Sequence, residues 1–301
     1  MDQMLRFSIP ERNVRGRTVR LQNVFAEISA THNYPPAIAT VLGEALCLAS
    51  LIGSLLKDAN GQLTMQAQTE NGIIDLLVCD YKDSAIRGYV KFDADRLKAE
   101  DDGKMGLSDL FGKGYLAITF DQKVEANKTG EGERYQGIVP LEGNSLSDAV
   151  QSYFFQSEQI PTFIRVAVDY SAAVPVVGGF LAQHLPEGEE GRERLHVQDD
   201  HPDWEHVQAF VETISADELT DLSLTPEQLL WRLFHEEKAI RTENGSAVVK
   251  GCRCNMVHIR DVLGRFPSDE RREMADEKGD IIVDCSFCSE KFAVPAVSFE
   301  N

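Results

Sequence analysis

The last fifth of the chain contains two close pairs of cysteines. Cys252 and Cys254 are separated by one residue, and Cys285 and Cys288, separated by two, follow about 30 residues later. This layout can bring four thiols to one point, and two chemistries compete for such a point. One is a tetrahedral zinc ion bound by thiolates. The other is the pairing of neighbouring thiols into disulfides.

The spacing within each pair predicts zinc binding. Cys-x-x-Cys is the usual half of a structural zinc site, whereas Cys-x-Cys is tighter than the common gap. A disulfide between residues so close in sequence is geometrically constrained, and strain makes a disulfide easier to reduce. The spacing therefore leaves open whether the zinc site is purely structural or also undergoes reversible oxidation. Cys47 and Cys79 have apolar neighbours, so we expect them to be small buried hydrophobes.

Composition excludes several classes of function. The chain has 301 residues, 43% of them hydrophobic, which is enough for more than one domain. Its formal charge of −19 would repel phosphate backbones, which argues against a nucleic-acid partner. The longest apolar stretch, residues 37–56, is interrupted by Gly43, Glu44 and Ser50 and predicts a buried helix rather than a membrane span.

The start of the chain lacks a basic segment followed by an apolar run, so we expect no secretory signal and a soluble, cytoplasmic protein. In that compartment clustered cysteines indicate metal or redox chemistry rather than permanent disulfides.

The pattern of residues 1–188 predicts an N-terminal α+β domain. Residues 15–21 alternate like an edge strand, and the helix at 37–57 is apolar on most sides, as expected of a helix packed on a sheet. Asn71-Gly72 carries a hairpin signal between alternating segments. Strands that follow one another through hairpins favour a mixed or antiparallel sheet with packed helices.

A charged, glycine-rich stretch at residues 187–194 marks a domain boundary. Residues 189–247 then predict a helical linker region, with capping boxes at Ser215 and Thr225. The apolar faces of its helices must be buried against another part of the protein. This region should therefore have the lowest local unfolding free energy, although the sequence alone favours an ordinary helical connector that stays folded.

Residues 248–301 predict a small C-terminal zinc-binding domain with two short helices and two strands. A segment of about fifty residues with so few large apolar side chains is marginal unless a metal stabilises it. Metal binding would then supply folding free energy, and loss of the metal would unfold the segment.

Other candidate sites are weaker. His258 could replace a thiolate, but four cysteines already complete a tetrahedron, and His235 lacks the second histidine of a zincin helix. Residues 112–114 (Gly-Lys-Gly) do not form a phosphate loop, and no catalytic or nucleotide-binding constellation is evident. The sequence thus predicts neither an enzyme nor a nucleotide-binding protein. The sequence also argues against a thiol oxidoreductase that uses Cys285 and Cys288, because no βαβ unit adjoins this pair as such enzymes would require.

The chain resembles the redox-regulated heat-shock holdases known as the heat shock protein 33 family. The resemblance spans nearly the whole length, and both cysteine pairs match the family pattern. It also rests on the segments GERYQG at 132–137, YFFQSEQIPT at 153–162, GGFL at 178–181 and LLWRLFHEE at 229–237.

The resemblance implies a switch. Reduced protein would bind one zinc through Cys252, Cys254, Cys285 and Cys288 and be inactive. Peroxide with heat, or hypochlorous acid, would form the disulfides Cys252–Cys254 and Cys285–Cys288, after which zinc is released and the terminal domain and linker unfold. The activated protein would dimerise and hold unfolding clients without ATP. The alternative is a constitutive protein-binding module with a purely structural zinc site.

Overall fold

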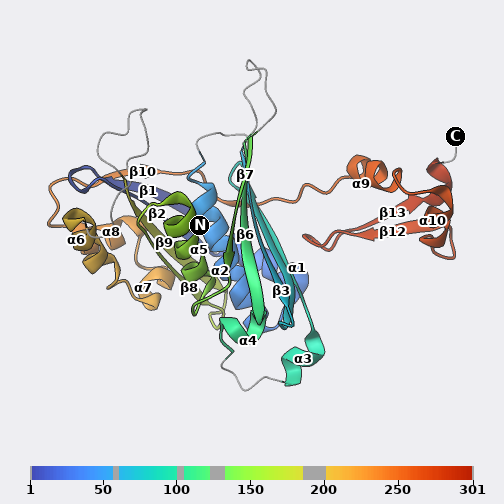
Figure 1. Cartoon of the computed structure of the whole chain (residues 1–301), viewed down its shortest axis with the longest axis horizontal. Coiled ribbons are helices and arrows are strands. Elements are labelled where there is room, and N and C mark those ends of the chain that lie inside the picture. Colours follow the sequence, from blue (N-terminus) through green and yellow to red (C-terminus); the bar gives the residue numbers. More distant parts are fainter. Residues whose placement is uncertain (1, 57–60, 100–104, 123–132, 186–200, 300–301) are drawn as a thin grey trace, which may run out of the picture.

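The computed structural model describes residues 2–56, 61–99, 105–122, 133–185 and 201–299, and it places two β-sheets on either side of one long helix (Figure 1). The first sheet has the strand order β10 (Arg241–Asn244), β1 (Gln3–Ile9), β2 (Val14–Leu21), β9 (Val176–His184) and β8 (Thr162–Asp169). The second has the order β11 (Val249–Lys250), β5 (Ala85–Phe92), β4 (Ile74–Lys82), β3 (Gln62–Glu70), β6 (Lys113–Gln122) and β7 (Glu133–Pro140). Neighbours are antiparallel except β11 and β5, which confirms the predicted α+β fold with a mixed sheet.

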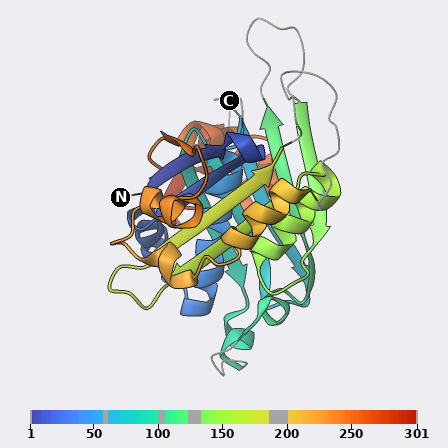
Figure 2. The ribbon, with the colours of Figure 1, turned by 90° about the vertical axis from the view of Figure 1, so that its left-hand side faces the viewer.

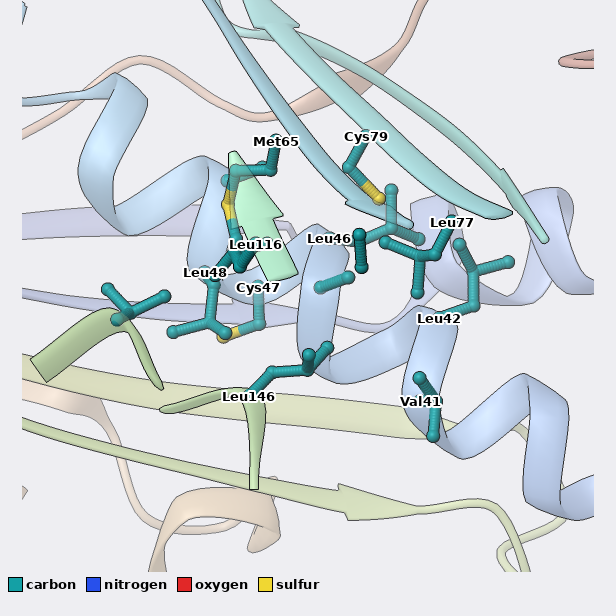
Figure 3. Packing of buried hydrophobic residues seen from close by; sticks show 14 of the residues in the cluster. Val41, Leu42, Leu46, Cys47, Leu48, Met65, Leu77, Cys79, Leu116 and Leu146 are labelled. Carbon is teal, nitrogen blue, oxygen red and sulfur yellow. The ribbon is translucent and has the colours of Figure 1, made fainter. Parts of the chain in front are cut away.

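Helix α2 (Pro36–Gly53) forms the centre of the molecule and contacts both sheets. It is long and apolar enough to cross a membrane by length and composition, but 78% of it is buried inside the protein, as the sequence predicted. Cys47 faces the first sheet and Cys79 faces α2 from the second, and both are fully buried (Figure 3). We use the name body for the two sheets together with the helical elements between residues 10 and 158 that pack on them.

Shorter elements complete the body. The Asn71-Gly72 turn joins β3 to β4, and Asn71 has the left-handed φ of 63° that such turns require. The helical elements of the body besides α2 are η1 (Pro10–Arg12), α1 (Asn23–His32), α3 (Ala94–Ala99), α4 (Leu107–Phe111), α5 (Leu146–Tyr153) and the π-helical turn η2 (Phe154–Glu158).

The outer face of the first sheet is covered by three helices, which we call the linker helices (Figure 2). They are α6 (Pro202–Val211), α7 (Ala216–Thr220) and α8 (Pro226–Phe234). Their apolar side chains form one buried cluster with Phe7 and Phe180 of the sheet, as the predicted apolar faces require. The predicted capping boxes at Ser215 and Thr225 are both present.

Two adjacent glycines allow the layers on both sides of β9 to approach closely. A Cβ at Gly178 would collide with the Leu219 carbonyl of α7, and a Cβ at Gly179 would collide with the Cys47 sulfur of α2. Every residue of β9 is buried, because helices cover both of its faces. The glycine pair of the GGFL segment is thus a packing requirement.

Arginines of the body donate to backbone carbonyls in and between the linker helices. Arg20 on β2 donates to Leu219 and Leu224 at 3.0 and 2.8 Å, and Arg165 on β8 donates to Ile214. The linker helices are therefore held by polar contacts as well as by apolar burial.

After α8 the chain returns to the body before it reaches the cysteines. It pairs with β1 as β10 and with β5 as β11, then leaves as the terminal unit, residues 252–299 (Figure 1). This unit contains α9 (Met256–Leu263), α10 (Ser268–Glu273), the hairpin β12 (Asp280–Asp284) and β13 (Lys291–Pro295), and the turn η3 (Ala296–Phe299).

Several details differ from the sequence prediction. Strand β1 was not predicted, and β2 lies between β1 and β9 instead of at a sheet edge. Strands β10 and β11 were not predicted either, and they join the sheets of the body although they lie within residues 189–247 and 248–301. Alternation of apolar and polar residues indicates that one face of a strand is buried. Which strands pair with it depends on segments that are distant in the sequence. The predicted boundary at residues 187–194 lies outside the described residues.

Candidate metal centre

The four C-terminal cysteines come together from two segments. Cys252 and Cys254 lie in the extended chain after β11, and Cys285 and Cys288 lie in the turn between β12 and β13. That turn is closed by bonds from the Cys285 N–H to the Glu290 carbonyl (2.9 Å) and from the Ser289 N–H to the Cys285 carbonyl (2.8 Å). The four sulfur atoms all lie within 4.8 Å of one another.

The cluster fits a tetrahedral thiolate site. Zinc–sulfur bonds of about 2.3 Å imply sulfur atoms about 3.8 Å apart. Cys252 Sγ lies 3.3 Å from Cys254 Sγ and 3.6 Å from Cys285 Sγ, and Cys254 Sγ lies 3.5 Å from Cys288 Sγ. Four soft sulfur donors at these separations suit a thiophilic cation.

The thiols in this cluster do not ionise alike. Burial opposes ionisation of Cys252, but hydrogen bonds from the Cys254 backbone and the neighbouring thiols outweigh it and lower its pKa to about 7. Burial and then the neighbouring thiols raise the pKa of Cys254, and burial raises the pKa of Cys288. One negative charge makes the next more costly, so four thiolates together require a cation among them.

The two remaining cysteines have the opposite character. Burial raises the pKa of Cys47 and of Cys79, in each case with a smaller contribution from a neighbouring carboxylate. A thiol that stays protonated and buried is a poor nucleophile and a poor ligand. Their prediction as buried hydrophobes is confirmed.

The terminal unit has little apolar material of its own. Its buried hydrophobic residues are Leu263, Ile281 and Val294, with a few half-buried neighbours such as Ile259 and Phe299. Such a core is small for an independent unit. The four-sulfur cluster is therefore placed where a metal would add the most to stability.

Both histidines set aside in the sequence lie apart from this cluster. Among the described residues, the group able to hold a metal consists of the four cysteines, and His258 is not part of it. His235 is exposed at the end of α8, where its Nδ1 lies 3.4 Å from the Arg232 carbonyl oxygen.

The tertiary structure also reveals contacts that the sequence did not suggest. Each cysteine pair encloses a residue that touches the body: Arg253 lies between Cys252 and Cys254, and Phe287 lies between Cys285 and Cys288. Arg253 pairs with Asp80 on β4, and Phe287 packs on Arg87 and Tyr89 of β5. No local pattern marks these partners, which lie about 170 to 200 residues away in the chain.

Comparison with known proteins places the chain in a family. The model of the family described as "Hsp33 protein" matches residues 2–295. The "33 kDa chaperonin" of Caulobacter vibrioides is 38% identical over 96% of this chain and 93% of the relative, and that of Cronobacter sakazakii is 32% identical over 98% and 93%. The crystal structure of a 33 kDa chaperonin (heat shock protein 33 homolog) from Thermotoga maritima has the same fold, with a TM-score of 0.79 at 22% identity over 100% of this chain and 97% of that one.

The matching family and these relatives define a chaperone and not an enzyme. The chain belongs to the Hsp33 protein family. The resemblance seen in the sequence is thereby confirmed.

Proposed function

We propose that this chaperone is an ATP-independent holdase controlled by oxidation of the four-cysteine cluster. The observation that carries the proposal is the convergence of the four sulfur atoms within 4.8 Å in a unit with a very small apolar core. Reduced protein would hold one zinc ion through Cys252, Cys254, Cys285 and Cys288 and be inactive. When bound, zinc would supply the charge that keeps four thiolates together and part of the folding free energy of the terminal unit.

The oxidation balances with hydrogen peroxide as the oxidant. A thiolate attacks one peroxide oxygen, the O–O bond breaks, and hydroxide leaves to give a sulfenic acid. A neighbouring thiolate then attacks that sulfur, an S–S bond forms, and a second hydroxide leaves. Each disulfide thus gives two electrons to one peroxide. We propose the pairs Cys252–Cys254 and Cys285–Cys288. The 3.3 Å separation of the Cys252 and Cys254 sulfur atoms supports the first of these pairs.

Oxidation would then expose an apolar surface. Thiols consumed in disulfides no longer donate to a metal, and the small core of Leu263, Ile281 and Val294 has little else to hold it. The linker helices carry a buried face that includes Trp204 and Leu230 and covers the first sheet. Their release would uncover apolar side chains of both helices and sheet, and such a patch can bind unfolding proteins.

Several further features belong to the same proposal. We infer an N-terminal domain at 1–188, a helical linker region at 189–247 and a zinc-binding domain at 248–301. We also infer a cytoplasmic location, dimerisation after activation, and no nucleic acid, nucleotide or membrane partner. The charge of −19 supports the first of these exclusions and would help to keep a client-bound complex in solution.

The test compares reduced, zinc-loaded protein with protein treated with peroxide at heat-shock temperature. Aggregation of a thermally unfolding client is followed by light scattering, zinc release with a colorimetric chelator, and thiols by counting. We expect suppression only after treatment, with one zinc released as four thiols disappear. A Cys79→Ala control should respond in the same way, since that thiol is buried outside the cluster. Retained zinc, or equal suppression by both forms, would instead support a constitutive binding module.

A further inference from the structure

The residues enclosed by the two cysteine pairs both contact the body. Arg253 Nη2 donates to Asp80 Oδ2 at 2.8 Å. The ring of Phe287 lies under the Arg87 guanidinium, 3.9 Å from ring centroid to Cζ, and meets the Tyr89 ring edge-on at 4.9 Å between centroids. The Phe287 carbonyl oxygen also accepts a hydrogen bond from His32 Nε2 at 3.1 Å.

On the body side, Asp80 connects these contacts. Its carboxylate is nearly buried, with 5% of the side chain exposed, and accepts hydrogen bonds from Thr64 Oγ1 at 2.8 Å and Arg87 Nε at 2.8 Å. Arg253 is therefore the second guanidinium on one buried carboxylate. Arg87, held by Asp80, in turn lies over the Phe287 ring, so the two contacts form one connected network.

The chain just before Cys252 is also fixed on the body. Gly251 N–H donates to the Ile86 carbonyl at 2.9 Å, which continues the pairing of β11 with β5. Lys250 Nζ donates to Thr31 Oγ1 of α1 at 2.9 Å. Arg253 thus emerges from an anchored segment directly toward Asp80.

We infer that Arg253 and Phe287, with Asp80, Arg87 and Tyr89, form a latch through which the body stabilises the reduced four-cysteine cluster and sets how readily it loses metal. This inference rests on the proposed switch, because it assigns a regulator to the same site. Closing Cys252 and Cys254 from 3.3 Å to a bond of about 2.05 Å would reorient the residue between them. Arg253 would then leave Asp80.

The coupling must be reciprocal. If reduced thiols favour contact between the terminal unit and the body, that contact favours the reduced, metal-bound cluster by the same factor. A substitution on the body that touches no cysteine should therefore change metal retention. A zinc site that folds and titrates independently of the body would not respond to such a substitution.

The first arm of the test measures zinc transfer from reduced, full-length protein to a competing chelator without oxidant. We expect Tyr89→Ala to accelerate transfer about two- to tenfold, the range that an aromatic pair commonly contributes. Tyr115→Ala is the matched control, because Tyr115 is a tyrosine of the same sheet, 40% exposed, on β6 instead of β5. Equal rates for wild type, Tyr89→Ala and Tyr115→Ala would overturn the latch.

The second arm tests whether the two sides act together. Phe287→Ala alone and combined with Tyr89→Ala form a double-mutant cycle, and we expect the combined effect to be smaller than the sum. Ser286→Ala controls for changes within the turn itself. Arg253→Gln should likewise raise hydrogen exchange in residues 85–92, a readout that needs neither oxidant nor client. The latch would be contradicted if the effects of Phe287→Ala and Tyr89→Ala on zinc transfer were fully additive and Arg253→Gln left hydrogen exchange in residues 85–92 unchanged.

The two proposals fail in different ways. If wild-type protein keeps its zinc and thiols under peroxide, the redox switch is wrong, while the chelator and exchange comparisons still decide the latch. If oxidation releases zinc at the same rate in every variant and the chelator rates are equal, the switch stands and the latch is wrong.

Discussion

Arg12 Nη1 lies 2.7 Å from Asp203 Oδ1, which ties the turn between β1 and β2 to the first turn of α6. The same guanidinium reaches Glu237 beyond α8 at 3.3 Å, and Glu237 also lies 2.8 Å from His206 Nε2. The hydrogen bond from Arg12 holds the pKa of Asp203 below its usual range, although burial opposes this. One arginine of the body therefore joins the first and last linker helices.

Arg12→Gln should loosen the linker helices without unfolding the body. The partners are about a quarter to a third exposed, apart from Glu237, so we expect a cost of about 1 kcal/mol after allowance for solvent screening. Hydrogen exchange in residues 202–211 should rise. The control is Lys238→Gln, which removes a more exposed pair with Glu11 between the same parts of the chain. Equal exchange in both variants would argue against a special role for Arg12.

Neighbouring residues of α8 should respond in opposite ways to truncation. Leu230 is 1% exposed in the cluster beneath the linker helices, whereas Trp231 is 65% exposed. Leu230→Ala should cost about 2–5 kcal/mol of local stability and allow some client binding before oxidation. Trp231→Ala should change stability by less than about 0.5 kcal/mol. Hydrogen exchange of residues 226–234, measured alongside urea unfolding, gives the stability of each variant. A larger loss of stability for Trp231→Ala than for Leu230→Ala would refute this account of the interface.

Removal of metal should unfold the terminal unit and leave the body folded. The terminal core rests on Leu263, Ile281 and Val294, while the body has a large cluster around α2. A strong zinc chelator added to reduced protein should abolish exchange protection in residues 256–295 and preserve it in residues 36–53. Return of protection on addition of zinc is the control for reversibility. Protection that survives chelation would show that the unit folds without metal.

Glu44 should make stability fall as pH rises. Its carboxylate accepts bonds from Ser147 N and Oγ at 2.9 and 2.7 Å, yet burial dominates and raises its pKa in the folded protein. Below the unfolded value of about 4.3 the group is protonated in both states and has no effect. Above it the unfolded state ionises first, so stability falls until pH passes the raised pKa and is flat beyond.

Glu44→Gln should lack this fall, so its stability relative to wild type should grow with pH by about 1.4 kcal/mol for each unit by which the pKa is raised. Urea unfolding from pH 4 to pH 9 provides the comparison. Glu142→Gln, at an exposed position, is the matched control. Parallel curves for Glu44→Gln and wild type would show that the buried carboxyl does not titrate in this range.

The sequence predicted the elements whose signals are local. The apolar run at residues 37–56 predicted α2, and Ser215 and Thr225 carried complete capping boxes. Strand β1 was missed and β2 was predicted at an edge. The partners of a strand are chosen by segments up to about 240 residues away, as when Leu5 pairs with Asn244.

The sequence by itself determined the chemistry of the candidate site, because sulfur donors and their spacing are properties of the covalent chain. It also determined that the apolar faces of the linker helices must be buried against another part of the protein, because the spacing of apolar residues along a helix is a local property. Only the tertiary structure decided that these faces pack on the first sheet. It also decided that Arg253 pairs with Asp80. Phe287 packs on Arg87 and Tyr89 for the same reason. Those contacts join segments far apart in sequence, and their free energy arises only when the sheet, the strand β11 and the turn at Cys285 are packed together.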